Sequence, residues 1–177
     1  MRSNLVLSAV ILGTVCLAGC GTANASTDTT STQHTTKSTT HTTSPTVDSQ
    51  LTKTGMKIGH LYIGQELSNV QAVYGKPSAK TIVHGNGAPQ WEYSKQGFTV
   101  GGSPVWTITV TNGFSGSTPR GIHIGSTEIE VKKAYPMYKM VQDNTQVFVE
   151  SSDKEYSIDF VLKNGKVTQV TLANEKP

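Results

Sequence analysis

Residues Tyr62–Pro77 read YIGQELSNVQAVYGKP, and a related stretch, IHIGSTEIEVKKAYP, follows at Ile122–Pro136. Four residues of the first stretch recur in the second, each displaced by 61 positions. They are Ile63, Gly64, Val70 and Tyr74, which recur as Ile124, Gly125, Val131 and Tyr135. A constant displacement across several positions is typical of a duplicated structural unit. The chain is therefore predicted to contain two copies of one unit.

The first stretch predicts a helix over 67–74. Its apolar residues Leu67, Val70 and Tyr74 recur at the spacing of one helical face. Gly75 suits the left-handed conformation that follows many helices, and Pro77 cannot continue a helix. We therefore interpret the stretch as an element that specifies the fold, and we expect any function to lie on the sheets and loops around it.

The second stretch predicts a helix that begins at a capping box. The Thr127 hydroxyl and the Glu130 carboxylate have the spacing at which each can satisfy a free amide at the helix start. The helix is expected to end by Ala134 or Tyr135, because the residue before Pro136 is disfavoured in the helical conformation.

Alternating apolar and polar residues predict short antiparallel strands after each helix. The predicted strands are 80–84, 90–94, 98–100, 105–110, 138–142, 146–151, 156–162 and 167–172. Turns are expected at Gly101-Gly102 and at Asn164-Gly165, the latter as a type I′ hairpin. Large apolar residues alternate with polar ones in the longest strands, so one face is predicted to be core and the other to meet water. The outward positions are Thr107, Thr109, Ser157, Asp159, Gln169 and Thr171.

Together these elements predict an α+β fold of two tandem repeats, 56–116 and 117–177. Each repeat would consist of a short helical segment packed on an antiparallel sheet of three to four strands. A chain of 177 residues with 35% hydrophobic residues allows one modest globular region of this kind.

The N-terminus carries the most specific motif of the chain. Residues 1–4 are a short basic start, and 5–15 form an apolar run that is too short to span a bilayer. The run ends in Leu17-Ala18-Gly19-Cys20, which resembles the lipobox of bacterial lipoproteins. We therefore predict a signal peptide at 1–19 and a lipid anchor, with acyl chains such as palmitate, on Cys20. An ordinary secretory signal cleaved after a small residue such as Ala25 is the alternative.

Residues 20–55 are dominated by threonine and serine and contain no aromatic residue. Such a segment cannot bury enough apolar surface to offset its conformational entropy, so it is predicted to be a disordered tether. Two or three acyl chains would anchor the protein stably. The predicted location is the extracytoplasmic face of the cell membrane, and the long tether favours a Gram-positive source.

The Ile63-Gly64 pair, Val70, the sequence Tyr-Gly-Lys-Pro and the Trp91-x-Tyr93 strand together resemble the SmpA/OmlA (BamE) family of small envelope lipoproteins. The duplication resembles the β-lactamase-inhibitory protein fold, in which each half packs helices on a four-stranded antiparallel sheet. The resemblance implies an inhibitor-like or scaffold module. The chain departs from that fold because it cannot form its disulfides, and because its outward strand positions are polar rather than aromatic.

Composition and motifs give little support for catalysis or for a cofactor. The formal net charge is +3 and no basic stripe is present, so nucleic-acid binding is not expected. The serines lack a nucleophile-elbow motif. The histidines of the predicted folded part do not have the spacing of a metal site, so we expect surface positions for His60, His84 and His123. No metal or cofactor is predicted.

Two functional hypotheses follow. The preferred one is a non-enzymatic, membrane-anchored envelope lipoprotein that binds a protein partner across the face of its sheets. Trp91 and Tyr93 are either core residues or, if exposed, part of that binding patch. The alternative is an envelope enzyme or accessory protein acting on cell-wall glycan or peptide. Its candidate groups are carboxylates that could approach one another in space: Glu92, Glu150, Asp153 and Glu155.

Overall fold

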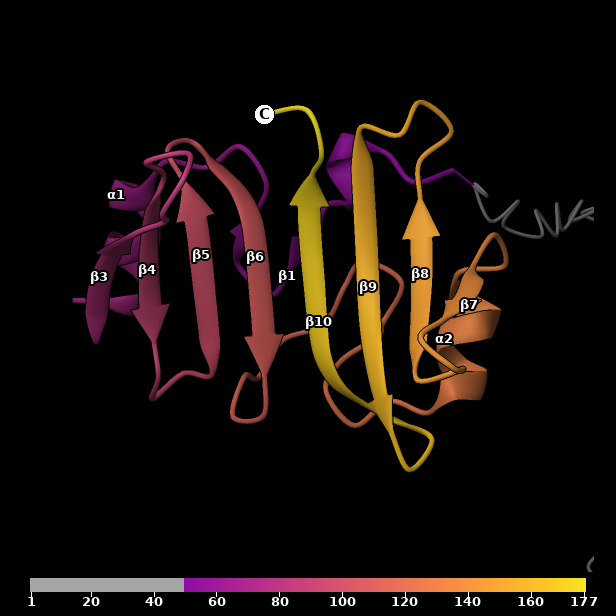
Figure 1. The fold of residues 1–177 in the computed structure, drawn as a ribbon. Helices are drawn as coiled ribbons and strands as arrows, with labels where there is room; N and C mark the ends of the chain where they lie inside the picture. The colour runs from indigo at the N-terminus through magenta and orange to yellow at the C-terminus, as the bar shows by residue number, and fades with distance from the viewer. Residues whose placement is uncertain (1–49) are drawn as a thin grey trace, which may run out of the picture. The chain divides into compact units, whose positions relative to one another are not determined.

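The structure is a computed structural model that describes residues 50–177 (Figure 1). The predicted signal peptide, Cys20 and the predicted tether up to residue 49 lie outside the described residues. Within the described part, no helix is long and apolar enough to cross a membrane.

The main feature is an eight-stranded antiparallel sheet with the strand order β3-β4-β5-β6-β10-β9-β8-β7. Its strands are β3 (Ala79–Ile82), β4 (Pro89–Tyr93), β5 (Phe98–Gly102), β6 (Val105–Thr111), β7 (Lys139–Val141), β8 (Gln146–Glu150), β9 (Tyr156–Lys163) and β10 (Lys166–Asn174). A separate pair consists of β1 (Lys57–Ile58) and β2 (Leu61–Tyr62). The helical elements are the 3-10 turn η1 (Lys53–Gly55) and the helices α1 (Leu67–Tyr74) and α2 (Glu128–Ala134).

The prediction of an α+β fold with two tandem repeats, each with its own sheet, is wrong. Strands β6 and β10 pair directly, from Gln169 opposite Thr111 to Ala173 opposite Thr107. This pairing joins all eight strands into one sheet, so the described fold is mostly β with two short helices. Alternation along a strand predicts which side chains face the core, but it does not specify which strand pairs with which.

The local predictions around the helices are confirmed, apart from the conformation of Gly75. Helix α1 spans the predicted residues and buries Leu67 and Val70. Gly75 follows it with φ 80° and ψ −161°, a positive-φ conformation that differs from the predicted left-handed helical one. Helix α2 has the complete capping box: the Thr127 hydroxyl accepts a hydrogen bond from the Glu130 amide, and the Glu130 carboxylate accepts one from the Thr127 amide. These features depend on neighbours within a few residues, so a sequence pattern suffices to predict them.

The turn predicted at Gly101-Gly102 is wrong, because both glycines belong to β5 and the chain turns after them at Ser103-Pro104. A Cβ atom at Gly102 would lie 2.7 Å from the Trp106 ring, and the backbone there has φ +95°. This glycine therefore permits close packing of a strand rather than a tight turn. The predicted turn at Asn164-Gly165 is present, and both residues have positive φ, as a type I′ turn requires.

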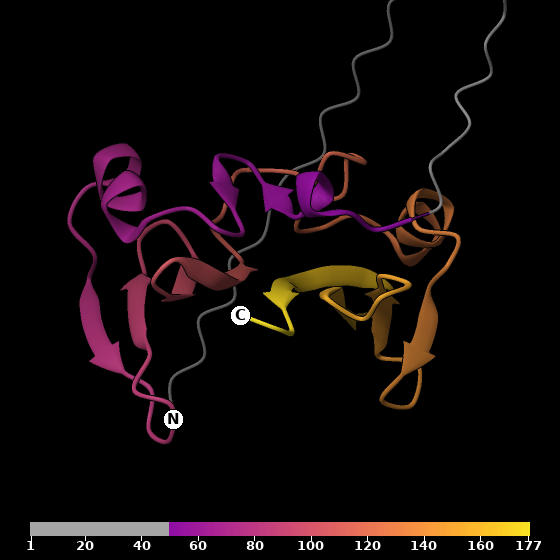
Figure 2. The ribbon, with the colours of Figure 1, turned by 90° about the horizontal axis from the view of Figure 1, so that it is seen from above.

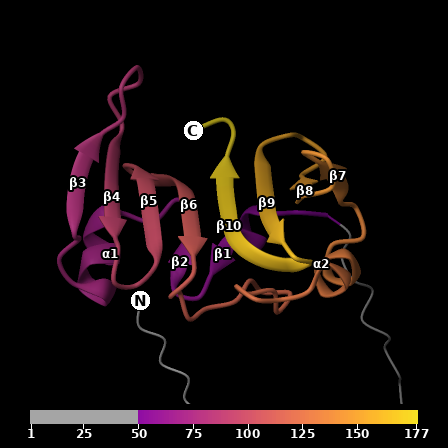
Figure 3. The ribbon, with the colours of Figure 1, turned by 60° about the horizontal axis from the view of Figure 1, so that its bottom comes forward.

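The helices and the β1–β2 pair lie on one side of the sheet. Figure 2 shows α1, the β1–β2 pair and α2 along that side, and Figure 3 shows the same arrangement from a second direction. The core lies between this layer and the sheet. It includes Ile58, Leu61, Val70, Tyr93, Val100, Ile108, Val131, Tyr135, Val147, Ile158, Phe160, Val170 and Leu172, each at most 1% exposed. No described element covers the opposite face of the sheet.

Candidate functional site

The uncovered face of the sheet presents side chains from all eight strands in registered rows. The row across its middle, which we call the middle row, follows the strand register from one edge toward the other. Its members are Ala79, Glu92, Thr99, Thr109, Thr171, Asp159, Phe148 and Lys139. The outward positions predicted from the sequence lie on this face, so the alternation of threonine with large apolar residues located it correctly.

The uncovered face is sheltered although nothing in the described residues packs on it. Figure 2 shows that the edge strands β3 and β7 bend away from the helices, so the uncovered face is the inner side of a curved sheet. Thr109, Thr171, Asp159 and Phe148 are accordingly half-buried. A protein partner could contact these side chains without any helix being displaced.

Asp159 is the least satisfied polar residue of this face. It lies on β9 between Thr171 of β10 and Phe148 of β8. Its Oδ1 atom is buried and has no hydrogen-bond partner among residues 50–177. Burial raises the pKa of this carboxyl above its ordinary value, because a desolvated carboxylate loses the stabilisation that water gives its charge. The site therefore holds an acid that lacks a donor.

The hydroxyl groups near Asp159 bond to one another and to the backbone. The Thr109 and Thr171 hydroxyls lie 3.3 Å apart across β6 and β10. The Thr107 hydroxyl lies 3.5 Å from the Leu172 carbonyl oxygen, and Ser157 donates to the Glu175 carboxylate at 2.5 Å. These bonds order the central strands of the face and leave Asp159 outside the network.

The uncovered face carries charges of both signs, with Lys163 and Lys166 where β9 and β10 meet at their turn and acids elsewhere on it. Besides Asp159, it carries Glu92 on β4 and Glu150 on β8, and Glu175 reaches it through Ser157. Lys139 is the cation of the middle row, and its Nζ lies 3.8 Å from a Glu150 carboxylate oxygen. Around Asp159, where Glu150 and Glu175 lie nearby, the face therefore favours a partner group that brings positive charge.

A shallow cavity of about 320 Å³ lies at one end of this face. It extends from the β3–β4 connection to the end of β10, and its lining combines polar groups with one aromatic ring. The lining residues include Asn86, Gln90, Thr107, Trp106, Ala173 and Glu175. This cavity extends the contact surface beyond the middle row.

Neither of the two aromatic residues considered for a binding patch, Trp91 and Tyr93, lies on the uncovered face. Tyr93 is 0% exposed and stacks on Phe98 with ring centroids 4.5 Å apart, so its side chain belongs to the core. Trp91 is half-buried on the helix side, where it lines a hollow together with Ser68, Gln71 and Ala72 of α1, and the Lys80 ammonium lies 3.7 Å from its ring centroid. Of the two, only Trp91 can contact a partner, and it would do so on the covered side of the sheet.

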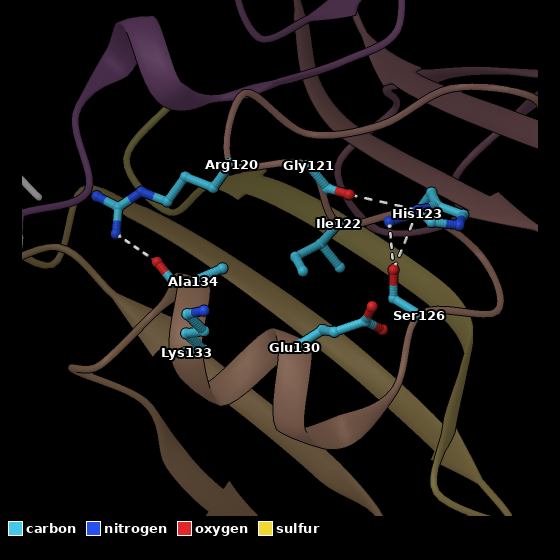
Figure 4. Close-up of a pocket in the computed structure, with 8 residues that line it drawn as sticks. All are labelled: Arg120, Gly121, Ile122, His123, Ser126, Glu130, Lys133 and Ala134. Atoms are coloured by element: carbon cyan, nitrogen blue, oxygen red, sulfur yellow. Dashed lines mark hydrogen bonds between the residues drawn. The ribbon is translucent and has the colours of Figure 1, made fainter. Parts of the chain in front are cut away.

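A second hollow, of about 470 Å³, lies between α2 and the loop before it (Figure 4). In it the His123 Nδ1 atom lies 3.1 Å from the Ser126 hydroxyl and 3.3 Å from the Gly121 carbonyl oxygen. The Ser126 hydroxyl also accepts a hydrogen bond from the His123 amide at 3.1 Å. The pair closes a four-residue turn, 123–126, so its hydrogen bonds are those of a loop rather than of a nucleophile with an oriented base.

The Glu130 carboxylate at the same hollow is occupied by the helix cap. It accepts hydrogen bonds from the Thr127 amide at 2.6 Å and from the Thr127 hydroxyl at 2.9 Å. These bonds lower the pKa of Glu130. Arg120 closes the other end of the hollow by donating to the Ala134 carbonyl oxygen at 2.9 Å. The polar groups here serve mainly to hold α2 and its preceding loop in place.

The carboxylates named for the enzymatic alternative do not gather at one place. Glu92 on β4 and Glu150 on β8 are separated by four intervening strands, which at about 4.8 Å per strand step is roughly 24 Å. Asp153 lies in the β8–β9 turn, where the Ser151 hydroxyl donates to it at 2.5 Å and lowers its pKa. Within residues 50–177 no group of three or more His, Cys, Asp or Glu residues could hold a metal ion. The histidines His60, His84 and His123 are exposed.

The comparisons with known proteins give two solved structures. One is an extracellular protein containing an SCP domain from Bacillus anthracis, with 18% identity and a TM-score of 0.43. The match covers 72% of this chain but 47% of that structure, so this chain spans about half its length. The other is a DUF4309 family protein (YjgB) from Bacillus subtilis, with 16% identity and a TM-score of 0.38, covering 73% of this chain and 90% of that one.

No protein-family model matches the chain, and no curated protein does. The resemblance to tandem BamE-like or β-lactamase-inhibitory protein repeats is corrected by the structure, because residues 50–177 form one continuous sheet with two short helices. The short motif that carried the resemblance consists largely of core and helix-ending residues, and such residues recur wherever a short helix packs on a sheet.

Proposed function

We propose that this protein is a lipid-anchored envelope protein that binds a protein partner across the uncovered face of its sheet and carries out no reaction itself. The observation that carries the proposal is that one whole face of an eight-stranded sheet lacks a covering layer in the described residues, although the side chains at its centre are half-buried. The lipobox at Cys20 and the Thr-rich tether support a position at the extracytoplasmic face of the membrane, since they would attach the domain there.

The dimensions of the face suit a protein partner. Eight strands at about 4.8 Å spacing extend roughly 34 Å from the first to the last. A standard interface buries about 800 Å² on each partner, which a face of this width accommodates with two or three rows of side chains. The mixture of threonine hydroxyls, Phe148 and carboxylates also matches the polar character of non-obligate interfaces.

Photo-crosslinking in intact cells tests the use of this face. A photoreactive phenylalanine derivative is placed at Thr109 or Thr171 in the middle row, and in a control variant at Val73, which is 59% exposed on α1. We expect one reproducible crosslinked protein from the middle-row positions and none from Val73. Equal crosslinking from all three positions, or no product from Thr109 and Thr171, would contradict binding across this face.

Membrane attachment is tested separately at the predicted lipidation site. A Cys20→Ala variant is expected to leave the membrane fraction and to lose incorporation of labelled palmitate, because the thiol that carries the diacylglycerol is absent. A Cys16→Ala variant is the matched control and is expected to fractionate like the unaltered protein. A Cys20→Ala protein that still sediments with membranes would argue against the anchor.

A further inference from the structure

We infer that the partner inserts a lysine or arginine side chain into the middle row of the uncovered face, where the cation pairs with Asp159. This inference rests on the proposed function and adds the chemistry of the partner to it. The partner is a protein segment that presents a basic residue at the centre of its contact surface.

Asp159 has unmet hydrogen-bonding capacity and is open to approach from one side. Its Oδ1 atom is buried without a partner among the described residues, although Thr171 and Ser157 are its neighbours on the same face, and the half-buried residue keeps part of its surface exposed, where a donor can reach the carboxylate. Most buried polar side-chain atoms in folded proteins have at least one hydrogen-bond partner. An ammonium or guanidinium group is the donor that a carboxylate binds most strongly.

The side chains on either side of Asp159 suit a lysine or arginine. Phe148 lies directly opposite Asp159 on β8, and Thr171 lies opposite it on β10. An aromatic ring on one side can pack against the methylene stem of a lysine or arginine, and a hydroxyl on the other can accept a further hydrogen bond from its head group. A small cation without a methylene stem would make no apolar contact with the Phe148 ring.

The charges nearest to Asp159 are mainly acidic. The titratable groups closest to it are Glu150 on β8, Glu175 after β10 and Lys139 on β7. On this face β9 and β10 place the uncharged Val161, Gln169 and Ala173 beside it, and Lys163 and Lys166 about 13 Å farther along the strands. Lys139 lies 3.8 Å from Glu150, so it offsets that acid rather than Asp159. The field at Asp159 therefore attracts a cation and repels an anion.

The pairing has a defined pH dependence. Burial raises the pKa of Asp159 above its ordinary value, so the carboxyl gains a proton earlier than an exposed aspartate as the pH falls. The neutral form no longer attracts the partner's cation. Binding is therefore expected to weaken as the pH falls through the pKa of Asp159, and a partner that binds without a salt bridge would not show this loss.

The test selects peptides from a random phage-displayed heptapeptide library on the purified mature protein. The unaltered protein is expected to enrich peptides with a central Lys or Arg, and their affinity is expected to fall about tenfold for Asp159→Asn, as for the loss of a partly desolvated charge pair. Asp143→Asn is the matched control, because it makes the same chemical change in the exposed β7–β8 turn. It is expected to leave the affinity unchanged. Circular dichroism checks that both variants are folded.

The remaining outcomes distinguish this inference from the proposed function. Enrichment of peptides without basic residues, or equal affinity for the unaltered protein and Asp159→Asn, would overturn the pairing with Asp159 while leaving binding across the face intact. Failure to enrich any peptide, together with no crosslinked protein from Thr109 or Thr171, would overturn both. A selected basic peptide that shifts the Asp159 side-chain carboxyl signal in a carbon-detected NMR spectrum would place the cation at this residue.

Discussion

Asp159 combines a position in the middle of a sheet with a carboxylate oxygen that no neighbour satisfies. The alternation along β9 predicts that the residue faces outward and is surrounded by water. The structure buries part of it instead, because β8 and β10 place Phe148 and Thr171 on either side and the sheet curves around this face. Burial of a single outward residue depends on strands that are distant in sequence, so a pattern along one strand cannot predict it.

The unsatisfied carboxylate leads to a prediction about stability. The pKa of Asp159 is raised in the folded state. The contribution of this residue to the free energy of unfolding is therefore most favourable below the unfolded-state pKa, and it is lost as the pH rises through the folded-state pKa. Asp159→Asn removes this loss and should raise the free energy of unfolding at pH 7 by about 1 kcal/mol, the lower end of the range for a buried unpaired polar group. Urea denaturation at pH 7 and pH 3 measures the effect, which should be largest at pH 7. A variant less stable than the unaltered protein at pH 7 would show that the carboxylate has a stabilising partner.

Helix α2 illustrates an element that its own residues specify. The capping box of Thr127 and Glu130 was predicted from spacing and is present in full. Lys132 and Glu128 pair at the i, i+4 spacing, and Val131 directs the helix into the core. The cap and the ion pair lie within one or two turns of the helix, so they depend on its own sequence. The pairing of β6 with β10, by contrast, was not predicted, because it joins strands that are far apart in the sequence.

The cap gives a prediction at the scale of this helix. Thr127→Ala removes the hydroxyl that accepts from the Glu130 amide at 3.3 Å and should lower the free energy of unfolding by about 1 kcal/mol. Thr127→Ser retains a hydroxyl and should lose less than half as much. Thermal or urea denaturation followed by circular dichroism measures both variants. Equal stability of the Ala and Ser variants would mean that the cap hydrogen bond contributes nothing to the fold.

At the scale of the whole described region, the pairing of β6 with β10 makes one sheet with one shared core. The two strands join β3–β6 to β7–β10 through a ladder from Thr107 to Thr111, and Ile108, Val110, Val170 and Leu172 on these strands are fully buried. A core shared across this ladder couples the two ends of the sheet. Separate repeats with separate cores would lack such coupling.

We therefore expect the described region to unfold in one cooperative transition. Both tryptophans, Trp91 and Trp106, lie on β4 and β6, so their fluorescence reports on one part of the sheet, whereas far-ultraviolet circular dichroism reports on all of it. The two signals should give the same midpoint in urea, as a two-state transition requires. Fluorescence and circular dichroism midpoints that differ would indicate two units that unfold independently.

The amino-acid sequence by itself determined the helix ends, the capping box, most strand positions and the alternation that distinguishes core from outward residues. These features depend on neighbours a few positions away, so local patterns are sufficient for them. Only the tertiary structure decided that β6 pairs with β10, that Tyr93 is buried in the core, and that Asp159 lies half-buried without a partner. Each of these depends on which distant strands lie side by side, and hydrogen-bonded register between strands is a long-range property that periodicity along one strand does not contain.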